Sequence, residues 1–179
     1  SYTDDNGFTE ENVSAASLPV SADAVNINGT LYIIGSAPYL SNAVLTAELV
    51  EQNGFDEAGV SYTWAADGVE IANSNSKTFT PTDYAGAIIS VTASYTDNDG
   101  YPETVTGSLD TLVYTQVVNN SAELATALNG VVAGSVIGLN SNQYADPAEI
   151  LLTNAVTIRA VEGQTPFILG EACIHVAAG

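Results

Sequence analysis

Apolar and polar residues alternate through residues 27–115, which is typical of strands in a sheet with one buried face. In the segment SVTASYT, for example, one side carries Val91, Ala93 and Tyr95, and the other side carries small polar residues. The pattern predicts six strands, at Thr30–Ile34, Val44–Val50, Val60–Ala66, Lys77–Thr80, Ala87–Thr96 and about Glu103–Tyr114. Turn sequences separate them at Asn53-Gly54, Asp67-Gly68, Asn73–Asn75 and Asp99-Gly100. Short strands with regular turns predict a β-sandwich.

Trp64 lies in the middle of one predicted strand, in the segment SYTWAADG. A tryptophan at this position is either the core aromatic of an immunoglobulin-like sandwich or a stacking platform for carbohydrate. Its central strand position and apolar neighbours favour the core.

The pattern changes after Tyr114, where a short helix is expected. Asn120 and Glu123 resemble a capping box, and Gly130 follows the helical segment. One face of the helix would carry Leu124, Ala127 and Leu128.

Short apolar strands then recur at regular spacing. One series is Val136–Leu139, Val156–Arg159 and Cys173–Val176, and a second is Ile150–Leu152 and Phe167–Leu169. Two interleaved series favour coils of a right-handed parallel β-helix with the helix as its N-terminal cap. A continuation of antiparallel sandwich strands is the alternative, and it fits less well because hairpin turns are sparse. The predicted fold class is therefore all-β: an immunoglobulin-like β-sandwich followed by the capped start of a right-handed parallel β-helix.

An internal repeat suggests how the chain is divided. Ser1–Glu10 (SYTDDNGFTE) matches Ser94–Glu103 (SYTDNDGYPE) at an offset of 93 residues. Residues 1–26 are then the closing hairpin of a preceding immunoglobulin-like repeat plus a linker. Residues 27–115 form one complete sandwich, and residues 116–179 form the cap helix and first, incomplete coils of the β-helix. Chance recurrence, or an extra strand of the same domain, is the alternative.

Residues of the sandwich carry a family resemblance. The stretch from Gly35 through LTAELV, SYTWAADGVEI and FTPTDYAGAIISVTASYTDNDG to ETVT resembles the bacterial immunoglobulin-like repeats of large secreted and cell-surface proteins. The resemblance covers about half of the chain and departs from antibody domains, which have paired cysteines, because the one cysteine is Cys173. It implies an extracellular spacer or adhesion module and no catalysis.

The last third of the chain carries a second resemblance. VNNSAELATALNGVVAGSVIGLNSNQY, VTIRA and FILGEACIHVAAG resemble the first coils of pectate-lyase-like β-helices, such as those of the alginate lyase and chondroitinase B kind. Many non-enzymes share this entry to the fold. The resemblance implies an alternative function, as the N-terminal, non-catalytic part of a secreted polysaccharide lyase that acts on acidic glycans.

Charge narrows the possible partners. The 179 residues include 21 acidic and 2 basic side chains, for a formal net charge of −19. Nucleic acids and anionic membrane surfaces require clustered Lys and Arg, so neither is an expected partner. No run of 18 apolar residues appears, so no membrane insertion is expected. A hydrophobic content of 46% is enough for a folded core.

The predicted turns are acidic, which raises the question of calcium. Asp97, Asn98 and Asp99 precede Gly100, and Asp4 and Asp5 occupy matching positions one repeat earlier. Closely spaced carboxylate and amide oxygens suit calcium, but the same residues also suit a plain hairpin turn. The loop pattern of an EF-hand is missing. Calcium is therefore a possible cofactor, and these five residues are its candidate ligands.

No complete catalytic site can be assembled from the basic groups of this span. A lyase needs a base and a positive group to stabilise developing charge, and the candidates are Lys77, Arg159 and His175. Cys173 and His175 share a strand face, but two ligands make a weak metal site. No enzymatic activity is expected of these residues alone, and a lyase is expected only if the β-helix continues.

Both ends of the predicted fold leave strands without partners. About two coils of β-helix cannot bury their own core, and a lone hairpin is marginal. Either the native polypeptide continues in both directions, or subunits complement each other end to end in a filament. The expected partners are therefore flanking domains or other copies of the same protein, and a glycan is a further candidate. The predicted function is a structural or adhesion segment of a secreted or cell-surface bacterial protein.

Overall fold

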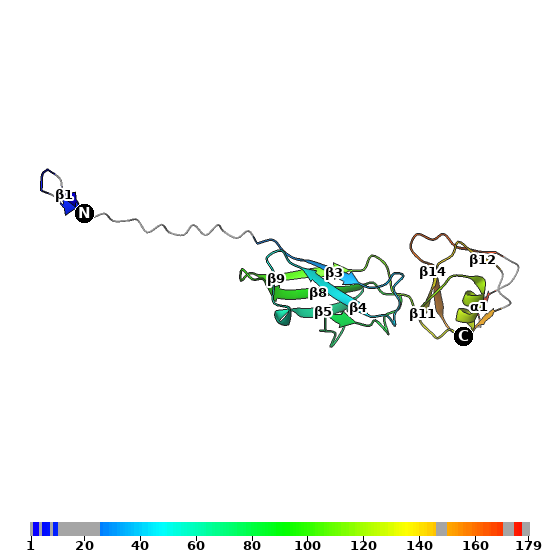
Figure 1. The fold of residues 1–179 in the computed structure, drawn as a ribbon. Coiled ribbons are helices and arrows are strands. Elements are labelled where there is room, and N and C mark those ends of the chain that lie inside the picture. The colour runs from blue at the N-terminus through cyan, green and yellow to red at the C-terminus, as the bar shows by residue number, and fades with distance from the viewer. Residues whose placement is uncertain are drawn as a thin grey trace.

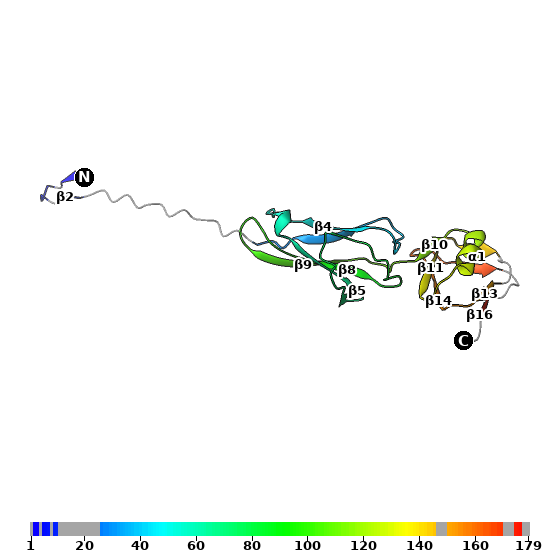
Figure 2. The same cartoon turned by 90° about the horizontal axis from the view of Figure 1, so that it is seen from below.

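The computed structural model describes residues 2–3, 5–7, 9–10, 26–145, 150–169 and 174–176. Residues 27–115 form a β-sandwich, and a set of parallel strands with one helix follows it along the long axis (Figures 1 and 2). Among the described residues, no helix is long and apolar enough to cross a membrane.

The sandwich consists of two antiparallel sheets. The three-stranded sheet has the order β3 (Thr30–Ile34), β4 (Leu45–Val50) and β7 (Thr78–Phe79). The four-stranded sheet has the order β6 (Val69–Glu70), β5 (Ser61–Ala66), β8 (Ile89–Thr96) and β9 (Pro102–Ser108). A 3-10 turn, η1 (Glu57–Gly59), precedes β5. The strands predicted from the alternation are all present, most of them a residue or more shorter than expected.

The core lies between these sheets, where the alternation places it. Val91, Ala93 and Tyr95 are buried on one side of β8. Trp64 is fully buried, its indole Nε1 donates a hydrogen bond of 2.8 Å to the Ser76 carbonyl, and its ring stacks on Phe79 at 5.3 Å. Because the ring is covered and its N–H is satisfied, Trp64 is a core residue.

The last predicted strand of the sandwich was too long. β9 ends at Ser108, and a bend at residues 110–111 interrupts the ladder. The chain then returns to the sheet, since the Val113 N–H bonds the Ala87 carbonyl at 3.0 Å, and Val113 and Tyr114 are buried. The apolar pattern through Tyr114 therefore reflects burial rather than one continuous strand.

Three short parallel sheets form the β-helix. The first has the order β10 (Gln116–Val118), β11 (Ser135–Leu139) and β14 (Val156–Ala160). The second pairs β12 (Gln143–Ala145) with β15 (Phe167–Leu169), and the third pairs β13 (Ile150–Leu152) with β16 (Ile174–Val176). All of these pairs are parallel, which excludes a continuation of antiparallel sandwich strands.

Two assignments within the β-helix were wrong. Ile174–Val176, predicted to follow Val156–Arg159 in one series, pairs instead with β13, and Phe167–Leu169 pairs with β12 rather than with Ile150–Leu152. Paired residues are 21 apart in the first sheet (Ser135 and Val156) and 24 apart in the others (Gln143 and Phe167). Each coil has three faces, and the spacing alone does not show which face a strand occupies.

The predicted helix is confirmed as α1 (Ser121–Asn129). The Asn120 Oδ1 accepts a hydrogen bond of 2.9 Å from the Glu123 N–H. Glu123 in turn accepts from the Asn119 N–H at 2.7 Å, and this bond holds the pKa of its carboxyl below the usual value. The expected face, Leu124, Ala127 and Leu128, is buried against the β-helix strands.

The N-terminal hairpin has the register of the β8–β9 hairpin. In β1 (Tyr2–Thr3) and β2 (Thr9–Glu10), Tyr2 pairs with Glu10, as Tyr95 pairs with Glu103 one repeat later. Gly7 and Gly100 both have positive φ, of 84° and 90°. The matching sequences therefore form matching hairpins. That the first is the end of a preceding domain stays a prediction.

Candidate functional site

The acidic turn between β8 and β9 contains one buried carboxylate and two exposed side chains. Asp97 is 4% exposed, whereas Asn98 and Asp99 are exposed. The Asp97 Oδ1 accepts hydrogen bonds from the N–H groups of Asp99 and Tyr101, at 3.0 and 2.7 Å. This arrangement is an Asx turn that stabilises the hairpin. The Asp97 Oδ2 is buried, and none of the residues that the structure describes gives it a hydrogen bond.

A second carboxylate is buried beside this turn. Glu103 is 6% exposed, and its Oε2 accepts hydrogen bonds from the Tyr95 hydroxyl at 2.5 Å and from the Gly29 N–H at 2.9 Å. The Tyr95 hydroxyl also lies 2.7 Å from the Glu51 Oε2. Four segments of the sandwich therefore meet around one phenol group: the residue before β3, the end of β4, and strands β8 and β9.

The electrostatics at this end of the sandwich are strongly negative. A phenol has one proton, so Tyr95 can donate to only one of Glu51 and Glu103 at a time. Burial and the bonds to these two carboxylates raise the pKa of Tyr95, so the phenol keeps its proton. The hydrogen bond from Tyr95 also lowers the pKa of the Glu51 carboxyl.

A loop after β4 covers the same end. The Phe55 ring lies 5.5 Å from the Tyr95 ring, and the Asn98 N–H bonds the Gly54 carbonyl at 3.0 Å. Gly54 has a φ of +77°, and a Cβ there would meet the Asn98 side chain at 2.5 Å. The exposed Asn98 side chain could move aside, so the positive φ is the main reason that glycine is favoured where the loop crosses the turn.

The structure brings only part of the predicted calcium set together. Asp97, Asn98 and Asp99 share the β8–β9 turn, whereas Asp5 is exposed in the turn of the N-terminal hairpin. Asp4 lies outside the described residues. No group of three or more His, Cys, Asp or Glu side chains is placed to hold a metal ion in the part of the chain that the structure describes.

Sequence reasoning missed Glu51 and Glu103 as members of this cluster. A signal for Glu103 was present, because the repeat aligns Tyr2 with Tyr95 and Glu10 with Glu103. No local pattern pointed to Glu51, which reaches Tyr95 from 44 residues away.

The basic candidates do not form a site together. Lys77 pairs with Glu57 at 3.2 Å on the sandwich surface. Arg159 lies on β14. His175 lies on β16, but its side chain and all of Cys173 lie outside the described part. The described residues therefore show no pairing among the three.

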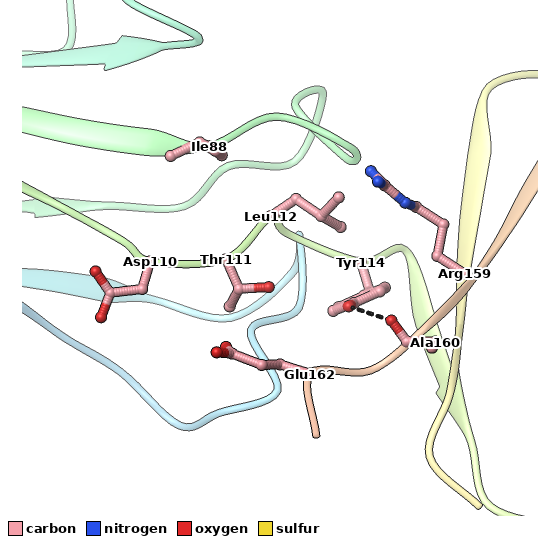
Figure 3. A pocket seen from close by; sticks show the side chains of 8 residues that line it. All are labelled: Ile88, Asp110, Thr111, Leu112, Tyr114, Arg159, Ala160 and Glu162. Atoms are coloured by element: carbon pink, nitrogen blue, oxygen red, sulfur yellow. Dashed lines mark hydrogen bonds between the residues drawn. The ribbon is translucent and has the colours of Figure 1, made fainter. Parts of the chain in front are cut away.

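Arg159 lies at the junction between sandwich and β-helix. It lines a groove of about 330 Å³ together with Asp110, Tyr114 and Glu162, and Figure 3 shows its side chain extending toward the segment around Leu112. It also lines a second groove, of about 610 Å³, with Asp67, Asp83 and Tyr84. Within the described ranges, no carboxylate lies within 4.0 Å of the guanidinium.

Comparisons with known proteins leave the family open. No family model matches this chain, and no curated protein does. Among solved structures, the chain is similar to the family 28 exopolygalacturonase of Yersinia enterocolitica, with 11% identity and a TM-score of 0.28. The match covers 75% of this chain and 31% of that protein, so the chain spans about a third of its length. A likeness this weak carries no argument about function.

Proposed function

We propose that this chain is a structural or adhesion segment of a larger secreted or cell-surface bacterial protein, in which an immunoglobulin-like sandwich is fastened rigidly to the start of a β-helix. The main support for this proposal is the packed junction between the two modules. A spacer must hold neighbouring modules in a fixed relative orientation, whereas a catalytic domain on a flexible tether does not need one.

The chain passes from one module to the other without a free linker. Tyr114 is 2% exposed and forms a small apolar cluster with Val136 and Val161. One residue later, the Thr115 N–H bonds the Val136 carbonyl at 2.9 Å, and the Thr115 hydroxyl accepts from the Val136 N–H at 2.9 Å. Packing and main-chain bonds therefore begin where the sandwich ends.

Other segments of the sandwich reinforce this junction. The Tyr114 hydroxyl donates to the Ala160 carbonyl of β14 at 3.2 Å, and the Ser41 N–H bonds the Tyr114 carbonyl at 2.8 Å. Figure 3 shows the Tyr114 bond to Ala160 next to the groove. The Ser41 bond fixes Tyr114 within the sandwich, whereas the Tyr114 bond to Ala160 crosses to the β-helix. Bending at residue 115 would therefore break the Tyr114–Ala160 bond together with the two Thr115–Val136 bonds.

The far side of the β-helix supports assembly with flanking segments or with other copies. In the described part, β14, β15 and β16 each have a strand partner on one side only. Phe167, Ile168 and Leu169 of β15 are 53%, 46% and 44% exposed. An apolar strand with a free edge is a template for another strand, so this edge is where end-to-end complementation would occur.

Distance measurements between spin labels test the rigid junction. Labels at Thr104→Cys and Thr153→Cys, in a Cys173→Ser background, place one probe on each module at exposed positions. We expect one narrow distance distribution. The matched control inserts six Gly and Ser residues between Thr115 and Gln116, and it should broaden the distribution severalfold. Equal widths in the two proteins would rule out a rigid spacer.

Sedimentation as a function of concentration tests the strand edge. Self-complementation predicts a mass that grows with concentration, and Ile168→Lys should suppress this growth because a charge blocks edge pairing. A chain that stays monomeric at all concentrations would exclude filament formation by itself, while leaving flanking segments of the protein as the partner.

Arg159 supports the second candidate, the non-catalytic part of a polysaccharide lyase that acts on acidic glycans. Its guanidinium has no carboxylate within 4.0 Å in the described ranges, and such a group suits a sugar carboxylate. Titration with uronate oligosaccharides should then show saturable binding that Arg159→Gln weakens about tenfold. If Arg159→Gln bound the oligosaccharides as tightly as the wild type, the groove beside Arg159 would not be the binding site, and the lyase function would lose its support.

A further inference from the structure

Two buried carboxylate oxygens at one end of the sandwich lack any partner. Over the described residues, Asp97 Oδ2 and Glu103 Oε1 are the buried side-chain polar atoms for which no hydrogen bond is formed. Asp97 is 4% and Glu103 6% exposed. Leaving a charged oxygen buried and unpaired is costly, so native structures rarely retain such atoms without a ligand or ordered solvent.

The two carboxylates belong to neighbouring inward positions of one sheet. Glu103 pairs with Tyr95 in the ladder, and Asp97 is the first residue after β8, where its N–H still bonds the Tyr101 carbonyl at 3.0 Å. Tyr95 and Asp97 are both buried, so Asp97 continues the inward alternation of β8. Such diagonal neighbours have Cα atoms about 7–8 Å apart, within reach of a common ligand between their side chains. Their placement is therefore compatible with a shared partner.

Each carboxylate is oriented by its other oxygen. Asp97 Oδ1 is held by the N–H groups of Asp99 and Tyr101. Glu103 Oε2 is held by the Tyr95 hydroxyl and the Gly29 N–H. These four hydrogen bonds fix the two carboxylate groups and leave the second oxygen of each one free.

Nothing in the described protein neutralises this negative charge. Glu51 adds a third carboxylate through its bond to Tyr95. Of the two basic residues of the chain, Lys77 pairs with Glu57 and Arg159 lines the junction grooves on β14. A bound cation would neutralise the charge and also supply the missing partner of both oxygens.

We propose that a divalent cation of the calcium class binds here, with Asp97 Oδ2 and Glu103 Oε1 as its carboxylate ligands and with main-chain oxygens and water completing the shell. Hard cations of this class take oxygen ligands, and sites with few carboxylates are weak, with dissociation constants on the order of 0.1–1 mM in extracellular modules. The exposed Asn98 and Asp99 are not ligands. This site goes beyond the proposed spacer function and does not rest on it.

The internal repeat carries the same three residue types. Tyr95, Asp97 and Glu103 correspond to Tyr2, Asp4 and Glu10 at the offset of 93 residues, although only some of the intervening positions match. The Tyr–Glu pairing is the same in both hairpins.

Thermal unfolding with and without calcium tests the proposal on the full chain. After treatment with a chelator, 10 mM calcium should raise the Tm of the wild type by about 5–10 °C. Glu103→Gln and Asp97→Asn should abolish most of this rise. The matched control, Asp99→Asn, lies in the same turn but carries an exposed side chain, and it should keep the rise.

The Tm of each variant in chelator distinguishes a carboxylate that binds the cation from one that only stabilises the fold. Removing an unpaired buried charge should leave the Tm of Glu103→Gln in chelator equal to or above that of the wild type. A purely structural carboxylate would instead lower the Tm in chelator and leave the calcium response intact. Trp64 fluorescence reports whether each variant retains the folded sandwich, since Trp64 is the one tryptophan.

Three results would overturn the site. One is a wild-type Tm that does not respond to calcium up to 10 mM. Another is loss of the response in Asp99→Asn, which would move the site to the exposed turn. The third is a Tm that rises on acidification but does not change with calcium, which would mean that a proton, and not a cation, is bound between the free oxygens. Each of these results can occur while the spin-label distances still support a rigid spacer, so the cation site and the spacer function can be rejected independently.

Discussion

The sandwich and the β-helix bury their residues in different ways. In the sandwich, β5 and β8 each follow their own alternation, so that every second residue contacts the opposite sheet. In the β-helix, β11 is buried at all five positions, whereas β15 is exposed at all three. β11 lies between β10 and β14, while β15 has one neighbour. A β-helix strand is therefore buried by adjacent coils rather than by its own pattern.

This difference predicts a one-way dependence between the two modules. The sandwich has a continuous core of its own, whereas β11 is covered partly by Tyr114 and partly by α1. Loss of the sandwich should remove one support of the β-helix, but loss of the β-helix should leave the sandwich folded.

Trp64→Ala should have the largest effect, about 3–5 kcal/mol, because it removes a fully buried aromatic from the sandwich core. Hydrogen exchange followed by mass spectrometry should show faster exchange both in the sandwich and in residues 116–139. Unchanged protection of residues 116–139 would show that the β-helix is independent of the sandwich.

Leu124→Ala should cost about 2–5 kcal/mol, but only in the β-helix, because Leu124 lies on the inner face of α1 and is fully buried in the β-helix core. The denaturation midpoint from Trp64 fluorescence should stay at the wild-type value while helical circular dichroism is lost earlier. A shift of both signals together would mean that the two modules unfold as one unit.

Gly138→Ala should cost about 1–3 kcal/mol at the junction, because a Cβ there would lie 2.8 Å from the Tyr114 ring and 3.0 Å from Val161. The matched control is Gly59→Ala, where a Cβ meets nothing within 4 Å. Urea denaturation of the two variants gives the comparison, and similar costs would argue against tight packing at the junction.

Asn120→Ala should cost about 1 kcal/mol through loss of the N-cap of α1. Asn120→Ser should restore most of the stability because its hydroxyl can accept the same N–H bond without placing a second carboxylate beside Glu123, to which the Asn120 amide donates at 2.7 Å. Helical circular dichroism during thermal unfolding checks both variants, and equal Tm values for Ala and Ser would mean that the cap bond is not formed in solution.

Acid should weaken the sandwich slightly through Glu51. The Tyr95 hydroxyl bond lowers the pKa of the Glu51 carboxyl in the native state, so this bond stabilises the fold above the usual glutamate pKa of about 4.3. That contribution is lost as the pH falls through the native pKa. In chelator, Glu51→Gln should therefore lose less stability than the wild type between pH 5 and pH 3, and identical losses would exclude the effect.

The sequence predicted the sandwich more completely than the β-helix. Alternation marks every sandwich strand locally except the two-residue β6, which was missed. The Asp67-Gly68 turn adopts the two positive φ angles, 49° and 79°, that a tight hairpin needs. In the β-helix, the strands of Gln116–Val118 and Gln143–Ala145 were missed, since each begins with a polar residue and lacks the continuous apolar run that marked Ile150–Leu152. Their pairing depends on coils 21 and 24 residues apart.

The candidate cation site, too, was only partly predictable from the sequence. The acidic turn and its glycine follow from local chemistry, and Asp97 was identified from that pattern. Glu51 and Glu103 join it only because the antiparallel register and the end of β4 bring distant carboxylates to one phenol group.

By itself, the sequence determined the all-β class, the buried face of β8, the start of α1 and the acidity of the turns. These features depend on residues within a few positions of each other, whose preferences act locally. Only the tertiary structure decided the three faces of the β-helix, the junction at Tyr114 and the inward placement of Asp97 beside Glu103. These depend on contacts between distant segments, and such contacts exist only once the chain has folded.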